Sequence, residues 1–273
     1  MCLECGCGRP GPTKIDGKPV DGHVHDHDHG HDHPHEHEHP HEHEHDHGHE
    51  HPHREIEVHQ SIFAANDRQA ERNRSTFLAL NLLVLNAVSS PGSGKTTLLA
   101  KTIERLSPAL RTGVVVGDLE TDNDARRLRT TGAPVVQIST GTLCHLDAEM
   151  VSKAAAKLPL RELDVLVIEN VGNLVCPAEF DLGENLRIAL LSVTEGEDKP
   201  LKYPPLFRGA DAVLVTKTDL SGPCEFDRGA ALENLRRVNP KARVFELSAK
   251  SGAGMGAWCD FLRESRAALA ASR

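Results

Sequence analysis

The sequence predicts an α/β domain with a mostly parallel β-sheet and helices on both of its faces. From about residue 80 onward, short continuous apolar runs alternate with segments of helical spacing. Continuous apolar runs are typical of strands buried on both faces, and the alternating order is that of parallel βαβ units. A glycine-rich segment ending in Gly-Lys-Thr directly follows the first run, where a strand would pass into a helix. A phosphate-binding loop occupies this position.

The individual elements follow from the same two patterns, taken in chain order. Residues 56–80 have helical spacing with many charges and predict one or two helices that lead into the domain. Apolar runs predict strands at residues 82–88, 114–118, 134–139, 163–169, 186–193, 212–216 and 244–247. Helical spacing predicts helices at residues 97–106, 122–131, 147–157, 226–238 and 255–268.

The 273-residue chain carries a formal net charge of −9, and this charge is concentrated near the N-terminus. Residues 1–60 contain 14 acidic and four basic residues, a net charge of −10, which leaves +1 for the remainder. A nearly neutral body offers no basic face suited to nucleic acid. The first residues show no signal peptide, and the apolar runs are too short to span a membrane. We therefore expect a cytoplasmic protein that binds neither nucleic acid nor membranes.

Composition divides the chain into three parts. Residues 1–8 form a cysteine motif, residues 9–55 form a histidine-rich segment, and residues 56–273 form the globular domain. The middle segment has almost no apolar surface to bury, so we expect it to be disordered. From residue 23 onward, histidine occupies every odd position of this segment: His23, His25, His27, His29, His31, His33, His35, His37, His39, His41, His43, His45, His47, His49, His51 and His53.

These histidines suggest weak, reversible binding of several divalent ions. Imidazole ligands and the Irving–Williams order favour nickel, although copper binds tighter still. An expression tag is the alternative, but the interleaved Asp, Glu, Gly and Pro residues differ from the plain histidine run of a tag. We interpret the segment as a nickel store or buffer.

Residues 89–96 (Ser-Ser-Pro-Gly-Ser-Gly-Lys-Thr) are predicted to bind the phosphates of a nucleotide. Backbone N–H groups of such a loop and the following helix N-terminus attract an anion. Lys95 would reach the β- and γ-phosphates, and Thr96 would ligate Mg²⁺. Ser89 stands where the motif usually has its first glycine, so an incidental glycine-rich turn is the alternative. The predicted phosphate-binding residues are Gly92, Ser93, Gly94, Lys95, Thr96 and Thr97.

Two short segments at strand ends predict guanine as the base. Asp219, in the Thr-Lys-Thr-Asp segment that begins at Thr216, can accept hydrogen bonds from guanine N1 and from its exocyclic amine. Adenine offers no such pair of donors and would leave the carboxylate unpaired, which favours GTP over ATP. Thr216 replaces the asparagine that usually opens this motif. The other predicted base-binding residues are Lys217, Ser248, Ala249 and Lys250.

A switch segment and magnesium ligands are predicted at two other strand ends. In residues 169–172, Glu169 could hold Mg²⁺ or its water, and the Gly172 N–H could sense the γ-phosphate. Asp118 and Asp122 follow another strand and are candidates for holding magnesium or positioning water. Helix capping by Asp122 or Asp124 is the alternative. The predicted catalytic residues are Lys95, Asp118 and Glu169, and the predicted magnesium ligands are Thr96, Asp118 and Glu169.

Three cysteines at the N-terminus suggest a metal site. Cys2, Cys5 and Cys7 place three thiolates within a few residues, and Gly6 and Gly8 let the chain wrap around an ion. This soft ligand set suits Ni²⁺, Zn²⁺ or Cu(I). A redox-active or incidental cluster is the alternative.

Cys144, His145 and Cys176 form a second candidate metal site. They make an incomplete tetrahedral ligand set that a dimer could complete. Lone buried cysteines and histidines are more often core residues, which is the alternative. Position is the stronger argument, because Cys176 lies four residues after Gly172. A switch moved by the γ-phosphate would then move a metal ligand.

Six segments of the sequence together carry a family resemblance. They are residues 2–7 (Cys-Leu-Glu-Cys-Gly-Cys), 66–74 (Asn-Asp to Asn-Arg), 89–97, 117–122 (Gly-Asp-Leu-Glu-Thr-Asp), 142–147 (Thr-Leu-Cys-His-Leu-Asp) and 169–177 (Glu-Asn-Val-Gly-Asn-Leu-Val-Cys-Pro). With these segments the chain resembles the HypB family, the nickel-incorporation GTPases of NiFe hydrogenase maturation, over essentially its whole length.

This resemblance implies a SIMIBI-class GTPase that forms a nucleotide- or metal-dependent homodimer. It implies a high-affinity nickel site at the three N-terminal cysteines and a nickel or zinc site at the internal Cys-His-Cys set. The implied partners are a HypA-type metallochaperone and the large-subunit precursor of a NiFe hydrogenase.

The expected function is a slow GTPase whose hydrolysis of GTP gates nickel transfer to this client. Hydrolysis should be slow because no arginine finger can be assigned in the sequence. A protein that mainly stores nickel is one alternative, and a sister GTPase of urease maturation is another. The N-terminal cysteines and the Cys144-His145 pair favour hydrogenase, because the urease family centres its metal site on a Cys-Pro-His motif.

Overall fold

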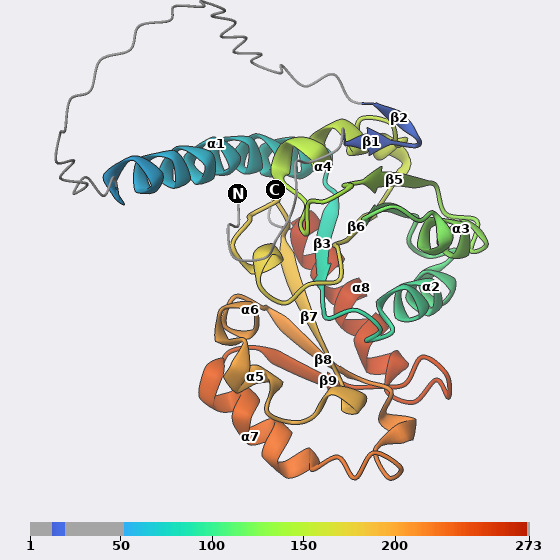
Figure 1. Cartoon of the computed structure of the whole chain (residues 1–273). Helices are drawn as coiled ribbons and strands as arrows, with labels where there is room; N and C mark the ends of the chain where they lie inside the picture. Colours follow the sequence, from blue (N-terminus) through green and yellow to red (C-terminus); the bar gives the residue numbers. More distant parts are fainter. Residues whose placement is uncertain (1–12, 20–51, 272–273) are drawn as a thin grey trace, which may run out of the picture.

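A nine-stranded β-sheet runs through the part of the protein that the structure, a computed structural model, describes: residues 13–19 and 52–271 (Figure 1). The predicted strands are present, and their ends differ from the prediction by at most two residues. The strands are β1 (Lys14–Ile15), β2 (Lys18–Pro19), β3 (Leu83–Val88), β4 (Thr112–Asp118), β5 (Val135–Ser139), β6 (Val165–Glu169), β7 (Leu186–Ser192), β8 (Ala212–Thr216) and β9 (Arg243–Glu246).

The strand order in the sheet is β2-β1-β5-β4-β6-β3-β7-β8-β9. Strands β3 to β9 pair in parallel, whereas β1 is antiparallel to both β2 and β5. The mostly parallel α/β fold is thus confirmed. Because β3 lies between β6 and β7, the loops that follow all three strands meet at one edge of the sheet.

Helices cover both faces of the sheet, as predicted. On one face lie α2 (Lys95–Leu106), α3 (Asn123–Arg129) and α8 (Met255–Ala271). The other face is covered by α1 (Pro52–Ala79), α4 (Ala148–Ala155), α5 (Lys199–Lys202), α6 (Pro204–Arg208) and α7 (Arg228–Val238). Short 3-10 helices follow several strands: η1 (Leu160–Glu162), η2 (Cys176–Ala178), η3 (Val193–Glu195) and η4 (Thr218–Leu220).

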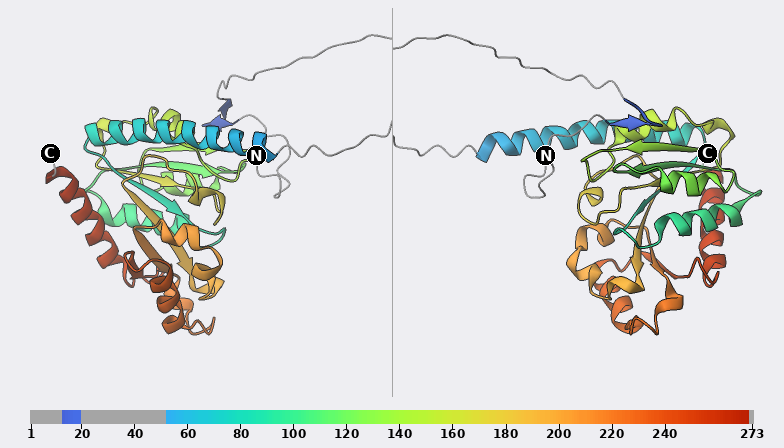
Figure 2. Two further views of the ribbon diagram at one scale, coloured as in Figure 1. Left: turned by 90° about the vertical axis from the view of Figure 1, so that its left-hand side faces the viewer. Right: turned by 45° about the vertical axis from the view of Figure 1, so that its right-hand side comes forward.

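The central strand shows how the two layers are separated. Leu83 and Leu85 of β3 pack with α2 and α8, whereas Val84 packs with α1 and α4. Figure 2 shows α1 (light blue) and α8 (red) on opposite sides of the sheet. Segment 56–80, for which the sequence allowed one or two helices, is a single helix that begins earlier, at Pro52. None of the helices in the described part is long and apolar enough to cross a membrane.

The hairpin of β1 and β2 corrects the expectation that residues 9–55 lack structure. Ile15 is 2% exposed and belongs to the core under α1 and α4. Asp16 and Gly17 form the turn at φ 48° and 76°, the left-handed region that an Asp-Gly hairpin turn requires. The Asp-Gly pair was the signal in the sequence, but residues 9–22, which contain no histidine, were grouped with the histidine-rich residues that begin at His23. His53, assigned to the same segment, lies within α1.

Candidate nucleotide and metal site

A cavity of about 560 Å³ lies at the edge of the sheet where β3, β4 and β6 end. The phosphate loop, the start of α2 and the switch segment surround it, which is the position that ligands take in parallel α/β sheets. Ten of the residues predicted to bind nucleotide or magnesium line this cavity: Gly92, Ser93, Gly94, Lys95, Thr96, Thr97, Asp118, Glu169, Gly172 and Lys217.

The phosphate loop has the backbone that its two glycines permit. Gly92 and Gly94 adopt φ of 73° and 93°, and Gly94 is the N-cap of α2. Lys95 is 7% exposed, and its Nζ donates to Ser89 Oγ at 3.0 Å. Burial lowers the pKa of Lys95. The serine at the usual glycine position therefore holds the lysine inside the loop, where a phosphate would otherwise contact it.

Thr96 and Glu169 form the part of the cavity that suits magnesium. Thr96 Oγ1 donates to Glu169 Oε1 at 2.7 Å, while Glu169 Oε2 is buried without a hydrogen-bond partner. Burial raises the pKa of Glu169 to about 7, against the opposing effects of Lys95 and Thr96. An unpartnered carboxylate oxygen beside a hydroxyl and a polar cavity fits a hard cation with oxygen ligands. The donor set is thus compatible with the predicted Mg²⁺.

Of the two aspartates considered at the end of β4, only Asp118 lies at the cavity. Asp118 lines the cavity, and its carboxylate accepts from the Glu120 N–H and the Thr121 hydroxyl. Asp122 is the N-cap residue of α3, but it makes no side-chain capping bond and pairs with Arg126 instead.

Two further residues of α3 line the cavity and were missed in the sequence. They are Asp124, which was considered only as a cap, and Arg127. Their spacing of three on a helix, which places both side chains on one face, was the signal that could have identified them.

A second cavity, of about 220 Å³, adjoins the phosphate loop and contains the predicted base-binding residues. Asp219 accepts a hydrogen bond from the Ser248 hydroxyl. Thr216 Oγ1 donates to the Ser93 carbonyl at 3.0 Å, so the threonine that replaces asparagine still contacts the phosphate loop. The residues that the two predicted segments contribute to this cavity are Thr216, Lys217, Asp219, Ser248, Ala249 and Lys250.

The structure brings the internal metal-ligand candidates together across 32 residues of sequence. Cys144 Sγ and Cys176 Sγ are 3.0 Å apart, and these sulfurs and a His145 nitrogen all lie within 4.8 Å of one another. A sulfur separation of 3.0 Å is far longer than a disulfide bond, so the two cysteines are not joined by a disulfide. This trio is the single group of three or more such ligands found in the described residues.

The surroundings of the His145 ring suit a metal ligand. Its ring stacks on Phe180 with centroids 4.0 Å apart and an interplanar angle of 18°. Its Nδ1 is buried without a hydrogen-bond partner. Burial lowers the pKa of His145 to about 4, so the imidazole is neutral at ordinary pH. Neutral imidazole and two cysteine sulfurs, which would lose their protons on binding, are ligands for nickel or zinc.

The switch segment contacts both the phosphate loop and the metal-ligand loops. A Cβ on Gly172 would lie 3.1 Å from Pro91 Cα and 3.2 Å from Pro91 N, so only glycine fits this approach without a shift. Asn170 Oδ1 accepts a hydrogen bond at 3.3 Å from the backbone N–H of Leu146, the residue that follows His145. Cys176 begins η2 four residues beyond Gly172.

Several predicted ligands lie outside the described residues. These are Cys2, Cys5 and Cys7 and the histidines from His23 to His51. The two other cysteines differ in their surroundings, because Cys259 is buried in the core and Cys224 is exposed.

The fold and the two cavities define a P-loop nucleotide-binding protein that carries a cluster of two cysteines and a histidine next to residues 169–172. The model of the CobW/HypB/UreG nucleotide-binding domain matches residues 83–246. The chain belongs to the HypB family of hydrogenase maturation factors.

Close relatives support this assignment over most of the chain. Hydrogenase maturation factor HypB of Azotobacter chroococcum mcd 1 is 54% identical over 80% of this chain and 72% of that protein. Hydrogenase/urease maturation factor HypB of Helicobacter pylori (strain J99) is 41% identical over 78% of this chain and 88% of that protein. The crystal structure of Helicobacter pylori HypB in complex with nickel is 42% identical, with a TM-score of 0.71 over 74% of this chain and 95% of that one.

Proposed function

We propose that this chain is a GTP-hydrolysing nickel metallochaperone that delivers nickel to the large-subunit precursor of a NiFe hydrogenase. One observation supports the proposal above the others: each of two loops contributes a thiol to one metal-ligand cluster, and one of these loops is continuous with the phosphate-sensing switch. The similar Helicobacter pylori HypB crystallised in complex with nickel, which supports nickel as the cargo.

Hydrolysis in this proposal depends on positioning and charge neutralisation. Lys95 would contact the β- and γ-phosphates, and Asp219 would select guanine. Magnesium would be held by Thr96, Asp118 and Glu169, and it would supply positive charge against the triphosphate. We expect slow turnover, because no arginine finger is assigned to the site.

Coupling between nucleotide and metal follows from the position of Gly172. Its N–H would bind the terminal phosphate, and its contact with Pro91 would change with the phosphate state. A shift of residues 170–172 would displace Cys176 relative to Cys144, which lies on the other loop. Nickel affinity would therefore differ between the GDP and GTP states.

The proposed partners are a second copy of the chain and a HypA-type metallochaperone. A second copy could complete the three-ligand set, and zinc could occupy the same ligands. Two large apolar side chains flank the sites on the surface, Leu119 at 44% and Val175 at 53% exposure. Exposed apolar side chains beside a ligand site are compatible with a nucleotide-dependent homodimer.

Nickel and zinc titrations of the apo, GDP-bound and GTP-analogue-bound protein test this function, with oligomeric state followed in parallel. We expect the affinity or ligand set of the internal site to differ between the two nucleotide states. Identical ligands and identical affinity in both states would contradict the proposal.

Urease maturation is a second candidate for the destination of the nickel. The 41% identical Helicobacter pylori relative is named a hydrogenase/urease maturation factor, which supports urease as an alternative destination. Expression of this chain in a host that lacks its own HypB, with hydrogenase and urease activities assayed separately, distinguishes the two destinations. We expect hydrogenase activity to be restored. Recovery of urease activity alone would contradict this expectation.

A further inference from the structure

A series of buried polar side chains connects β3 with the loop between β6 and β7 and begins at Asn170, which lines the nucleotide cavity. Asn86 in the middle of β3 is 0% exposed, and Asn170 is 1% exposed. Asn170 Nδ2 donates to Asn86 Oδ1 at 3.2 Å, and Asn86 Nδ2 donates to Glu184 Oε1 at 3.0 Å. Burying polar groups in a central strand is costly unless every one is paired. These contacts account for a polar residue in an otherwise apolar strand.

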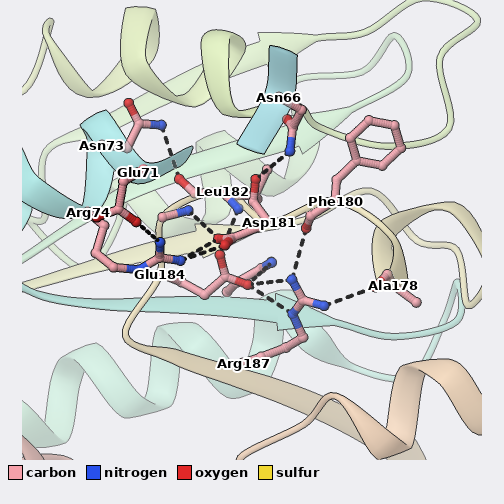
Figure 3. Close-up of polar contacts among 12 residues, drawn as sticks. Asn66, Glu71, Asn73, Arg74, Ala178, Phe180, Asp181, Leu182, Glu184 and Arg187 are labelled. Atoms are coloured by element: carbon pink, nitrogen blue, oxygen red, sulfur yellow. Dashed lines mark hydrogen bonds and ion pairs between the residues drawn. The ribbon is translucent and has the colours of Figure 1, made fainter. Parts of the chain in front are cut away.

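Glu184 extends the series to Arg187 at the start of β7. Arg187 Nε donates to Glu184 Oε1 at 2.9 Å, and the two side chains are 14% and 6% exposed. The guanidinium also donates to the carbonyls of Ala178 at 3.0 Å and Phe180 at 2.9 Å (Figure 3). Arg187 therefore holds the segment that directly follows the metal-ligand candidate Cys176.

Both ends of this series contact residues that neighbour the metal-ligand cluster. At one end the Phe180 ring, whose carbonyl Arg187 holds, stacks on His145. At the other end Asn170 Oδ1 accepts from the Leu146 N–H, the residue after His145. We call Asn170, Asn86, Glu184 and Arg187 the buried polar path.

Helix α1 holds the same loop from its opposite side. Arg74 Nη2 donates to both carboxylate oxygens of Asp181, and Asn73 Nδ2 donates to the Leu182 carbonyl at 3.1 Å (Figure 3). These residues anchor the loop to α1, whereas the buried polar path connects it to the switch.

We propose that Glu184 and Arg187 are positioning residues that transmit the nucleotide state of the switch to the metal ligands. This inference rests on the proposed function and specifies how its two sites communicate. A displacement of Asn170 would change its bond to Asn86. Glu184 and Arg187 would carry that change to residues 178–180, beside Cys176 and against the ring of His145. Fully paired, buried networks have few alternative arrangements, so a change at one end favours a change at the other.

Nickel titrations of the full-length chain carrying Cys2→Ser, Cys5→Ser and Cys7→Ser test this path. In that parent protein the thiolate-to-nickel absorption reports on the internal site. The measured quantity is the ratio of nickel Kd values with GDP and with a non-hydrolysable GTP analogue. We expect this ratio to differ from one by about fivefold or more in the parent.

Glu184→Gln and Asn86→Ala interrupt the path without touching nucleotide or metal. We expect either change to bring the Kd ratio to within about twofold of unity, while nucleotide affinity and nickel-free GTP hydrolysis remain at the parent level. Glu184→Gln preserves the size of the side chain, so it also controls for the cavity that Asn86→Ala creates. A purely structural role would lower nickel affinity equally in both nucleotide states and leave the ratio unchanged.

Arg74→Gln is the matched control, because Arg74 contacts the same loop from α1. We expect this variant to keep the ratio of the parent. If both path variants keep the Kd ratio of the parent, or if Arg74→Gln loses it equally, the proposed role of the buried polar path is contradicted. A parent protein with a ratio of one overturns the proposed function itself and the path with it, so the two failures are distinguishable.

Discussion

Buried polar side chains of the nucleotide cavity are paired with one another in a way that a nucleotide would rearrange. Lys95 donates to Ser89, and Thr96 donates to Glu169. Each pair occupies groups that a phosphate or Mg²⁺ would need. Binding would therefore replace internal hydrogen bonds with stronger charge-assisted ones. These internal bonds offset part of the cost of burying polar groups, whereas Glu169 Oε2 is buried without a hydrogen-bond partner.

Replacing Lys95 tests whether the nucleotide and metal functions are modular. We expect Lys95→Ala to lower GTP hydrolysis at least about 100-fold, because it removes the charge nearest the β- and γ-phosphates. Nickel binding at the proposed N-terminal cysteines should stay at the wild-type level. The rate of hydrolysis is measured with radiolabelled GTP, and nickel binding is measured by equilibrium dialysis. Equal loss of both in folded protein would show that the sites are not separable.

Glu169 gives the nucleotide-free protein a predictable pH dependence. Its pKa is raised from 4.5 to about 7 by burial, so the folded state keeps a proton that the unfolded state loses over this range. The contribution of Glu169 to the free energy of unfolding is fully present below the lower value and is lost as pH rises through the higher one. We expect Glu169→Gln to reduce this loss of unfolding free energy with rising pH. Denaturant titrations at about pH 5 and pH 7.5, without Mg²⁺, compare the variant with wild type; parallel pH profiles would contradict the assignment.

At the scale of elements, α1 connects the loops that carry the metal-ligand candidates. Asn66 Oδ1 accepts from the Ala148 N–H, and Asn66 Nδ2 donates to the Asp181 carbonyl, so one side chain joins α4 to the loop beyond Cys176. Asn73 bridges the same two segments through the carbonyls of Ala148 and Leu182. The asparagines of residues 66–74, which the sequence marked only as a family motif, therefore hold the two loops together.

The β1–β2 hairpin should stabilise the edge of the sheet that it forms with β5. Ile15 is buried against α1 and α4, so Ile15→Ala should lower the free energy of unfolding by roughly 2 kcal/mol. Loss of hydrogen-exchange protection at β5, its paired neighbour, should accompany this change. Lys18→Ala, at an exposed position of β2, is the control and should shift stability by less than about 0.5 kcal/mol. Unchanged β5 protection in the Ile15 variant would refute the role of the hairpin.

At the scale of the whole molecule, the described elements on either side of the histidine-rich residues allow a deletion between them to be designed. Because α1 begins at Pro52, a deletion of residues 23–49 removes most of the tail histidines and leaves both the hairpin and α1 intact. If the segment stores nickel, hydrogenase maturation should survive this deletion at ample nickel and fail when nickel is scarce. Hydrogenase activity measured across a nickel series checks this expectation. Failure at every nickel concentration would instead assign the segment a central role in delivery.

Local sequence patterns determined the order of elements and the nucleotide site of this protein. Continuous apolar runs specify buried parallel strands, and the Gly-Ser-Gly-Lys-Thr segment at the end of such a run needs only its immediate neighbours to form a phosphate loop. The same local signals placed Asp118, Glu169 and Asp219 at strand ends, and parallel pairing then brought those ends to one edge of the sheet.

Only the tertiary structure decided which distant residues meet. Cys144 and Cys176 are 32 residues apart, and their sulfurs approach because β5 and β6 end at the same edge of the sheet. Asn86 reads in the sequence as an interruption of an apolar strand, and its partners on two other segments appear only in the fold. Spacing along the chain cannot encode such contacts, because they depend on the order in which the strands pair, and that order is fixed by packing of the whole sheet.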